Sequence, residues 1–365
     1  MKSRILVGLM VFFSLLLFTS ICAFGEGEKQ PAPKEKKTLS LLIWEGYAED
    51  EWVKPFEKQY GVTITSTYVG SNDEMFAKMV AGKGSGYDLI SPNIGQMFQF
   101  EEAGVIVPID MSKIPNYKEI SPGFIQKTEE ITVINGKHWI IPYVFGDLPL
   151  LYNGDVVKPA PTSWNVLWSE KYKGRISIWD EATADIALAA LALGFPDPFD
   201  LTDRQLEQCK QKLIEQKPIL RKYHVGFGEE QNLLLSKEVV ALASHGIMTL
   251  IRLQERGLNI KEASPKEGVL GWCDGWSISK GAEDADLAHK WVNYCISKDV
   301  QVTVLRKSLY AVVNRTVVEE LTPEEIKTFH MDDPEYPLKL AFMKPPEDLA
   351  KRIKMWNEVK AAPVE

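Results

Sequence analysis

The 365-residue chain is poor in the residues on which metal centres and disulfide scaffolds depend. It has four cysteines and five histidines, without a CxxC pair and without histidines at metal-ligand spacing. The sequence therefore predicts no metal site. Cys209, Cys273 and Cys295 lie beyond the N-terminal region. One disulfide at most can join two of them, and three buried thiols are the simpler expectation.

Catalytic and phosphate-binding motifs are absent as well. The sequence contains no GxSxG, no HExxH, no P-loop and no GxGxxG after its first predicted strand. The glycine cluster GKGSG at residues 82–86 is interpreted as a flexible connection between a helix and a strand. These absences argue against an enzyme and against a cofactor.

Basic charge is also in deficit, with 42 Lys and Arg against 50 Asp and Glu, a formal net charge of −8. An acidic protein without basic clusters is a poor candidate for nucleic acid. It is better suited to cationic ligands.

A nearly continuous apolar run occupies residues 5–18, after Lys2 and Arg4 and before small residues at 23–25. It is shorter than the ~20 residues of a membrane-spanning helix, so residues 1–25 are predicted to be a signal peptide for export to the periplasm. Cys22 leaves lipidation open as an alternative. The charged, proline-bearing residues 26–37 are predicted to form a disordered lead-in.

After the lead-in, apolar spacing alternates between strand and helix. Strands are predicted at 39–44, 62–69 and 87–91, with helices at 51–60 and 72–81 between them. This pattern indicates an α/β fold with a mainly parallel sheet in each lobe, covered by helices, and ligands outside the carboxyl ends of the strands. The chain is longer than one core usually reaches, which favours two lobes.

The second half continues the alternation and ends in a charged segment, 322–365, which is predicted to place a surface helix against one lobe. Further strands are predicted at 148–152, 175–179, 239–244 and 268–280, and further helices at 185–193, 203–216, 287–296 and 300–305.

Three separated blocks are more specific than these patterns. They are IWEGYAED at 43–50, followed by SNDEMFAKM and YDLISP; TSWNVLWSEKYKGRISIWDEA at 162–182; and SPKEGVLGWCDGWSI at 264–278. In this order they resemble the spermidine/putrescine-binding proteins of bacterial ABC importers, and the resemblance covers about residues 39–314.

This resemblance implies a two-lobed periplasmic binding protein of type II, whose lobes close on a ligand in the cleft between them. We expect one lobe to comprise 38–143 plus 275–308, and the other 144–274 plus 309–365. The resemblance also implies a monomer that delivers its solute to an ABC permease and its ATPase.

A polyamine site needs aromatic walls and carboxylates, since an indole face attracts an ammonium group by roughly 0.5–2 kcal/mol and each unpaired ammonium is costly to desolvate. Trp44 and Tyr47 match the family's aromatic pair on the ligand, although they can equally be core aromatics. Trp272 and Asp274 match a pair from the opposite lobe, where the aspartate binds a ligand amine. The alternatives for Asp274 are a helix cap or a hinge salt bridge.

The other matches are incomplete. Glu181 lies at one family carboxylate, but Ala184 occupies the position of a second. Asp185 either replaces that second carboxylate or favours the start of the following helix. Gly46 stands where an acidic residue is usual, and Glu45 precedes it.

Further departures affect the walls of the slot. Asn93 can replace a family hydroxyl, whereas Gly95 lacks the expected aromatic ring. Ser244 and His245 stand in place of a tryptophan and asparagine pair. His245 either contacts a ligand carboxylate or is a structural residue.

The sequence therefore predicts an exported binding protein that captures a polyamine such as putrescine or spermidine. The missing carboxylates and aromatics leave another small organic cation or an amino-acid-like zwitterion as the alternative ligand. A glycoside hydrolase that uses Glu181 and Asp185 is a remote alternative.

Overall fold

A computed structural model describes residues 37–363. The predicted signal peptide, Cys22 and residues 26–36 of the predicted lead-in lie outside the described residues. Lys37, the last residue of that lead-in, already belongs to the first strand. Within residues 37–363, every helix is too short or too polar to cross a bilayer.

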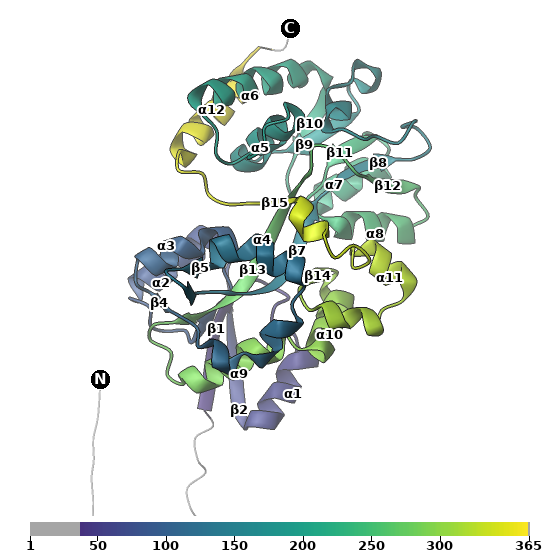
Figure 1. Cartoon of the computed structure of the whole chain (residues 1–365). Coiled ribbons are helices and arrows are strands. Elements are labelled where there is room, and N and C mark those ends of the chain that lie inside the picture. The colour runs from purple at the N-terminus through teal and green to yellow at the C-terminus, as the bar shows by residue number, and fades with distance from the viewer. Residues whose placement is uncertain (1–36, 364–365) are drawn as a thin grey trace, which may run out of the picture. The chain divides into compact units, whose positions relative to one another are not determined.

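The first sheet contains eight strands in the order β14-β7-β13-β3-β1-β2, with β15 and β4 also paired to β13 (Figure 1). Its strands are β1 (Lys37–Ile43), β2 (Val62–Tyr68), β3 (Leu89–Ile90), β4 (Ile106–Val107), β7 (Ile141–Leu148), β13 (Val269–Ser279), β14 (Ala311–Val312) and β15 (Leu340–Phe342). β1 runs parallel to β2 and β3, but β13 runs antiparallel to β3 and β7.

The second sheet has the order β10-β9-β11-β8-β12. Its strands are β8 (Leu150–Asn153), β9 (Ile176–Trp179), β10 (Leu220–His224), β11 (Ala241–Ala243) and β12 (Ile260–Ala263). β9 is parallel to β10 and β11, whereas β8 is antiparallel to β11 and β12. Both sheets are thus mixed rather than mainly parallel, because strands that enter from the crossing segments run against the βαβ units.

Helices surround these sheets. They are α1 (Asp50–Tyr60), α2 (Asn72–Ala81), α3 (Met97–Glu102), α4 (Pro122–Thr132), α5 (Ala182–Ala192), α6 (Asp203–Gln216), α7 (Gly226–Leu235), α8 (Ile247–Glu255), α9 (Ala285–Cys295), α10 (Lys298–Ser308), α11 (Pro323–Thr328) and α12 (Leu349–Ala361). α2 and α6 have the predicted bounds. α5 begins three residues before its prediction, and α3, α4, α7 and α8 were not predicted.

The chain passes between the two sheets at short connections. Only Pro149 separates β7 of the first sheet from β8 of the second, and residues 264–268 join β12 to β13. α12 lies within the segment 322–365, for which a surface helix was predicted. It packs against α5 and α6. β14 and β15 pair within the first sheet, although they come from the range 309–365 that we expected in the second lobe. The division into lobes stays a prediction.

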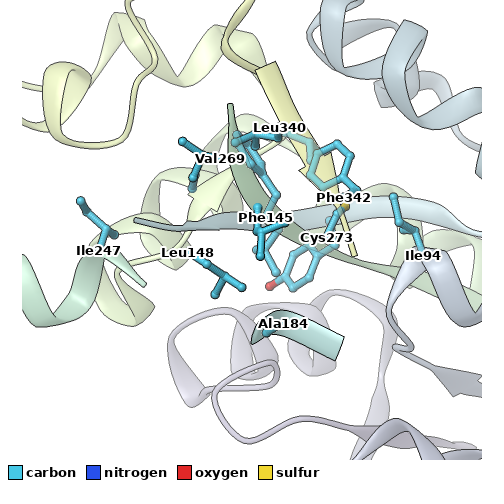
Figure 2. Close-up of a cluster of buried hydrophobic side chains, with 14 of the residues drawn as sticks. Ile94, Phe145, Leu148, Ala184, Ile247, Val269, Cys273, Leu340 and Phe342 are labelled. Carbon is cyan, nitrogen blue, oxygen red and sulfur yellow. The ribbon is translucent and has the colours of Figure 1, made fainter. Parts of the chain in front are cut away.

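A buried apolar cluster surrounds the crossing strands (Figure 2). It brings Phe145 of β7, Cys273 of β13 and Phe342 of β15 together, and the ring of Phe124 lies 4.9 Å from that of Phe145. Burying one such side chain stabilises a fold by about 1.5–3 kcal/mol, so the cluster holds the three strands in register. Cys273, like Cys209 and Cys295, is a buried free thiol.

Candidate functional site

Asp274 is a buried carboxylate near the centre of β13, with 7% of its surface exposed. Tyr47 Oη donates a hydrogen bond of 2.6 Å to Asp274 Oδ2, and Asn93 Nδ2 donates one of 3.2 Å to Oδ1. No lysine, arginine or histidine within residues 37–363 forms an ion pair with it. Asp274 thus has the neutral partners of a binding site and lacks the cation of a hinge salt bridge.

The electrostatics of Asp274 follow from this environment. Burial raises the pKa of its carboxyl to about 7, and the hydrogen bonds from Tyr47 and Asn93 only partly oppose that rise. A bound cation would stabilise the ionised carboxylate that burial disfavours. The site is therefore electrostatically prepared for a positively charged ligand.

Tyr47 reaches Asp274 from the turn after β1. The turn is closed by a 3.3 Å hydrogen bond from Tyr47 N to Trp44 O, and Gly46 has a φ of +86°. Residues other than glycine rarely adopt that conformation, so the acidic residue usual in the family would be strained there. Glu45 is exposed, whereas Trp44 is half-buried against the core and its Nε1 lacks a hydrogen-bond partner.

A row of aromatic rings extends from Asp274. The centroids of Tyr47 and Tyr310 are 6.1 Å apart, and those of Tyr310 and Trp272 are 5.2 Å apart at an interplanar angle of 88°. Gly146 of β7 makes room for Trp272, because a Cβ at that position would lie 2.8 Å from the indole. Tyr310 was not predicted: it follows the end of α10 in a turn, and no sequence pattern marks its approach to Asp274.

Trp272 and Tyr310 also line a cavity that contacts His245, Asp147 and His330. His245 lies in the loop between β11 and α8. Its Nδ1 is 2.9 Å from Glu230 Oε2, so the ring makes a structural contact and faces the cavity at the same time.

A second cavity is lined by Asn93, Glu181 and Lys344. Glu181 is the N-cap residue of α5, and burial raises the pKa of its carboxyl. Asn93 contributes both to this cavity and to the Asp274 hydrogen bonds. The two sets of predicted residues are therefore contiguous through Asn93.

Asp185 is fully buried in the first turn of α5. Its Oδ2 accepts a 3.0 Å hydrogen bond from the backbone N–H of Glu181. This is the contact that the helix-start alternative requires, and burial raises the pKa of Asp185 well above its usual value. Asp185 and the exposed Glu45 line neither cavity.

Gly95 lacks the expected aromatic side chain because the chain returns across it. A Cβ on Gly95 would collide with the carbonyl oxygen of Met343 and lie 2.8 Å from Lys344 Cα. Lys344, also not predicted, places a cation beside the second cavity, where its Nζ lies 3.0 Å from Asp197 Oδ2.

Within residues 37–363, two groups of side chains could hold a metal ion, although sequence spacing predicted none. They are His224, Glu230 and His245, and separately Asp147, Glu262 and His330; within each, the ligand atoms lie within 4.8 Å of one another. Each group is assembled from different elements, which explains why spacing did not indicate it. In both groups histidine–carboxylate contacts already connect the members.

Residues 51–337 match the family model described as bacterial extracellular solute-binding protein. The chain belongs to this family. It is a family of solute-binding transport proteins, not of enzymes.

This solute-binding protein is similar to periplasmic proteins of known name. It is 27% identical over 293 residues to the spermidine/putrescine-binding periplasmic protein of Escherichia coli (strain K12), covering 80% of this chain and 81% of that protein. It is 26% identical over 311 residues to the putrescine-binding periplasmic protein PotF of the same strain, covering 80% and 81%.

Solved structures show the same fold. The spermidine/putrescine ABC transporter substrate-binding protein PotD from Streptococcus pneumoniae has a TM-score of 0.78 at 23% identity, covering 89% of this chain and 99% of that chain. The Tp0655 (TpPotD) lipoprotein of Treponema pallidum has a TM-score of 0.71 at 21% identity, covering 89% of this chain and 98% of that chain. The predicted periplasmic-binding-protein fold of type II is confirmed.

Proposed function

We propose that this protein captures a polyamine of the putrescine or spermidine type and delivers it to an ABC permease and its ATPase. Curated relatives named for putrescine and spermidine binding, each matching about four fifths of the chain, support this role.

The observation that carries the proposal is the buried Asp274 carboxylate with its two neutral donors and no ion-pair partner. An ammonium group there would form a charge-assisted hydrogen bond in a water-poor site. The rings of Tyr47, Tyr310 and Trp272 would cover the methylene chain and attract the charge by roughly 0.5–2 kcal/mol.

Around this centre we assign the ligand site to the predicted residues together with Tyr310. Tyr47, Asn93, Trp272 and Asp274 would contact the ligand near one amine, and Glu181 would attract a further amine beyond Asn93. The remaining predicted residues are Trp44, Glu45, Asp185 and His245. Asp185 would act through the start of α5, because its carboxylate is buried there.

Isothermal titration calorimetry with putrescine and spermidine tests the proposal. We expect saturable binding by the wild type and a loss of at least about 30-fold in Asp274→Asn, because charged partners in buried pairs contribute roughly 2–5 kcal/mol. Asp284→Asn is a matched control, since Asp284 pairs with Lys37 and lies outside both cavities. Absence of binding by the wild type would contradict the proposal.

A second candidate ligand is a small zwitterion or another organic cation. Lys344 favours the zwitterion, because its ammonium group lines the cavity next to Asn93 and could pair with a ligand carboxylate. Titration with 4-aminobutanoate, which has the chain length of putrescine and one carboxylate, distinguishes the two classes.

We propose no catalytic role. The pair Glu181 and Asp185 would have to flank a scissile bond, yet the Asp185 carboxylate is fully buried and bound to the Glu181 backbone. Turnover of model glycosides that disappears in Glu181→Gln would contradict this.

We also propose that residues 1–25 direct export, with lipidation of Cys22 as the alternative. The protein would act as a two-lobed monomer. The periplasmic names of the curated relatives support the location. Mass spectrometry of the mature protein would distinguish a cleaved, lipid-free N-terminus from a lipidated cysteine.

A further inference from the structure

Resting on the proposed function, we infer that Glu230 holds His245 as a hydrogen-bond acceptor for a second ligand N–H group. The site then selects diamines and longer polyamines over amino-acid zwitterions. His245 is the specificity-determining residue, and Glu230 is its positioning residue.

Glu230 is a fully buried carboxylate in α7 that accepts hydrogen bonds from the loop after β11 and from α8. Its Oε1 accepts hydrogen bonds from Ser244 Oγ at 2.9 Å and from Thr249 Oγ1. Its Oε2 accepts from the backbone N–H of His245 at 2.9 Å. Three donors therefore converge on the two carboxylate oxygens, and this arrangement favours the ionised form of Glu230.

The ionised carboxylate determines which ring nitrogen of His245 carries the proton. A carboxylate only accepts hydrogen bonds, and His245 Nδ1 lies 2.9 Å from Glu230 Oε2, so Nδ1 is the donor. In a neutral imidazole with a proton on Nδ1, Nε2 is a lone-pair acceptor.

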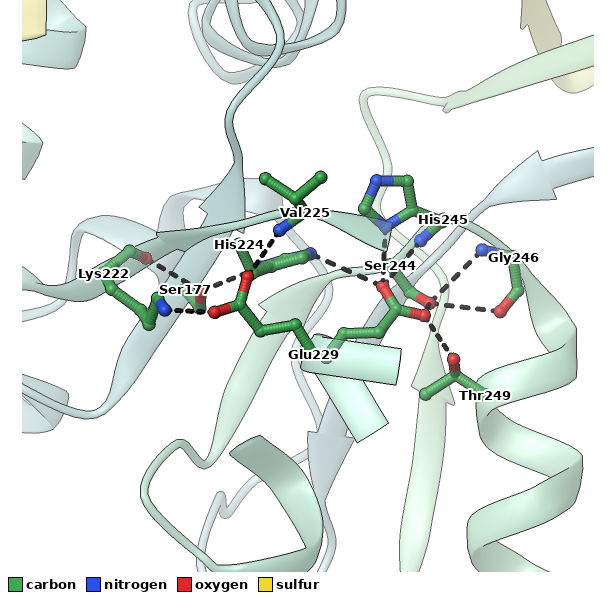
Figure 3. A network of polar contacts seen from close by, with 10 residues as sticks. Ser177, Lys222, His224, Val225, Glu229, Ser244, His245, Gly246 and Thr249 are labelled. Atoms are coloured by element: carbon green, nitrogen blue, oxygen red, sulfur yellow. Dashed lines mark hydrogen bonds and ion pairs between the residues drawn. The ribbon is translucent and has the colours of Figure 1, made fainter. Parts of the chain in front are cut away.

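This acceptor is available to a ligand. Figure 3 shows one ring nitrogen of His245 turned toward the polar network and the other turned away from it. Nε2 has no hydrogen-bond partner within residues 37–363, and the side chain, 24% exposed, lines the cavity that Trp272 and Tyr310 also line.

The aromatic row connects this acceptor with Asp274. Tyr47 contacts Asp274, Tyr310 lies between Tyr47 and Trp272, and both Tyr310 and Trp272 line the cavity of His245. Asp274 and Tyr47 do not themselves line this cavity. A ligand with one ammonium at Asp274 would therefore extend its apolar stem along Tyr310 and Trp272 to bring a second N–H group to the lone pair. A ligand N–H satisfies that lone pair, whereas a carboxylate faces it as a second acceptor.

The test compares three four-carbon ligands by calorimetry in the presence of a chelator: putrescine, 4-aminobutanoate and butylamine. We expect the wild type to prefer putrescine to both others by roughly tenfold or more. His245→Phe keeps a ring of similar size and removes Nε2, so putrescine should lose about tenfold in affinity while butylamine changes less than about twofold.

Glu230→Gln tests the positioning role. Its amide can donate to Nδ1 and thereby move the imidazole proton to Nε2. Putrescine affinity should fall and 4-aminobutanoate affinity should rise, so the ratio of the two shifts by about tenfold or more. Thr249→Val is the matched control: it removes one hydrogen bond to Glu230 without touching His245, and the ratio should stay within about twofold of the wild type.

The nitrogen-15 chemical shifts of His245 provide a readout that does not depend on whether Glu230→Gln folds. They should report a protonated Nδ1 and an unprotonated Nε2 in the wild type at neutral pH. A proton on Nε2 instead, equal binding of putrescine and 4-aminobutanoate, or equal losses for putrescine and butylamine in His245→Phe would overturn the inference while the proposed function stands. A wild type that binds no amine would contradict both.

Discussion

Asp274 and Glu230 are both buried carboxylates near the candidate ligand site, but their surroundings differ. Asp274 receives hydrogen bonds from Tyr47 and Asn93 alone, and its pKa rises to about 7. Glu230 accepts from a backbone N–H, two hydroxyl groups and an imidazole, and its pKa falls to about 2. Burial acts in the same direction on both, so the number of donors decides the sign.

From this difference we propose different roles for the two carboxylates: Asp274 binds the ligand, and Glu230 supports the structure. The hydrogen bonds that Glu230 accepts offset the cost of burying its charge, and they connect it to the loop after β11. Asp274 is under-compensated, and an external cation can supply the missing stabilisation. Each prediction below tests one side of this comparison, from the largest expected effect to the smallest.

The largest effect is expected on stability, in Glu230→Ala. Removing the carboxylate leaves several buried donors unpaired, and breaking such a network typically costs about 3–5 kcal/mol. Urea denaturation would measure the loss. Glu229→Ala is the neighbouring control, because Glu229 forms an exposed pair with Lys222 and should contribute less than about 1 kcal/mol. Similar losses of unfolding free energy in Glu230→Ala and Glu229→Ala would show that Glu230 stabilises the fold no more than an exposed carboxylate does.

Asp274→Asn should show the opposite profile. Amine binding should weaken by about 2–5 kcal/mol, because the ammonium loses its charged partner. The free protein should become more stable at pH 8, since the variant no longer buries a charge. Calorimetry and thermal unfolding would measure the two effects, and a large loss of stability would show that Asp274 is structural.

The pH dependence of binding follows from the Asp274 pKa of about 7. Below that value the carboxyl is neutral in the free protein, so affinity for an ammonium ligand should fall by up to about tenfold per pH unit. Glu230 remains ionised over this range. Titrations between pH 5 and 8 would show this slope in the wild type and its absence in Asp274→Asn.

The contributions of Asp274 and Glu230 to the stability of the fold should also depend on pH in opposite directions. The folded-state pKa of Asp274 is above its ordinary value of 3.8, so its contribution to stability is present below that pH and is lost as the pH rises through about 7. The folded-state pKa of Glu230 is depressed, so its contribution is present above pH 4.5 and is lost as the pH falls toward 2. Stability–pH curves of each variant, subtracted from the wild type, would separate them.

Tyr310→Leu should have a smaller effect on the binding side. It removes a ring between Tyr47 and Trp272 and should weaken amine binding by roughly 0.5–2 kcal/mol, the range of a cation–π contact. Tyr117→Leu is a control, since Tyr117 lines neither cavity. Unchanged affinity in Tyr310→Leu would exclude the aromatic row from the ligand site.

Lys344→Gln should have the smallest effect. Removing a cation beside Asn93 and Glu181 should strengthen spermidine binding by no more than about 1 kcal/mol, because Lys344 is partly exposed and paired with Asp197. Weaker spermidine binding in this variant, measured by calorimetry, would contradict repulsion by Lys344.

Local sequence signals predicted the parts of this fold that depend on neighbouring residues. Apolar spacing placed α2 and α6 at their observed bounds, and β1, β2 and β9 within about one or two residues. The family resemblance put Tyr47, Asn93 and Asp274 in one predicted ligand site, and hydrogen bonds connect them. The short helices α7 and α8 were missed, although α8 carries an amphipathic pattern.

By itself, the sequence determined the α/β alternation and the family, and it singled out Asp274 as the carboxylate of the candidate site. Local periodicity and contiguous motifs are sufficient to indicate these features. Only the tertiary structure showed that Asp185 contacts the start of α5, that Gly95 yields space to residues 343–344, and that Tyr310 and Glu230 contact Trp272 and His245. Each of those outcomes depends on a contact between segments far apart in the chain or on burial, and neither leaves a pattern in adjacent residues.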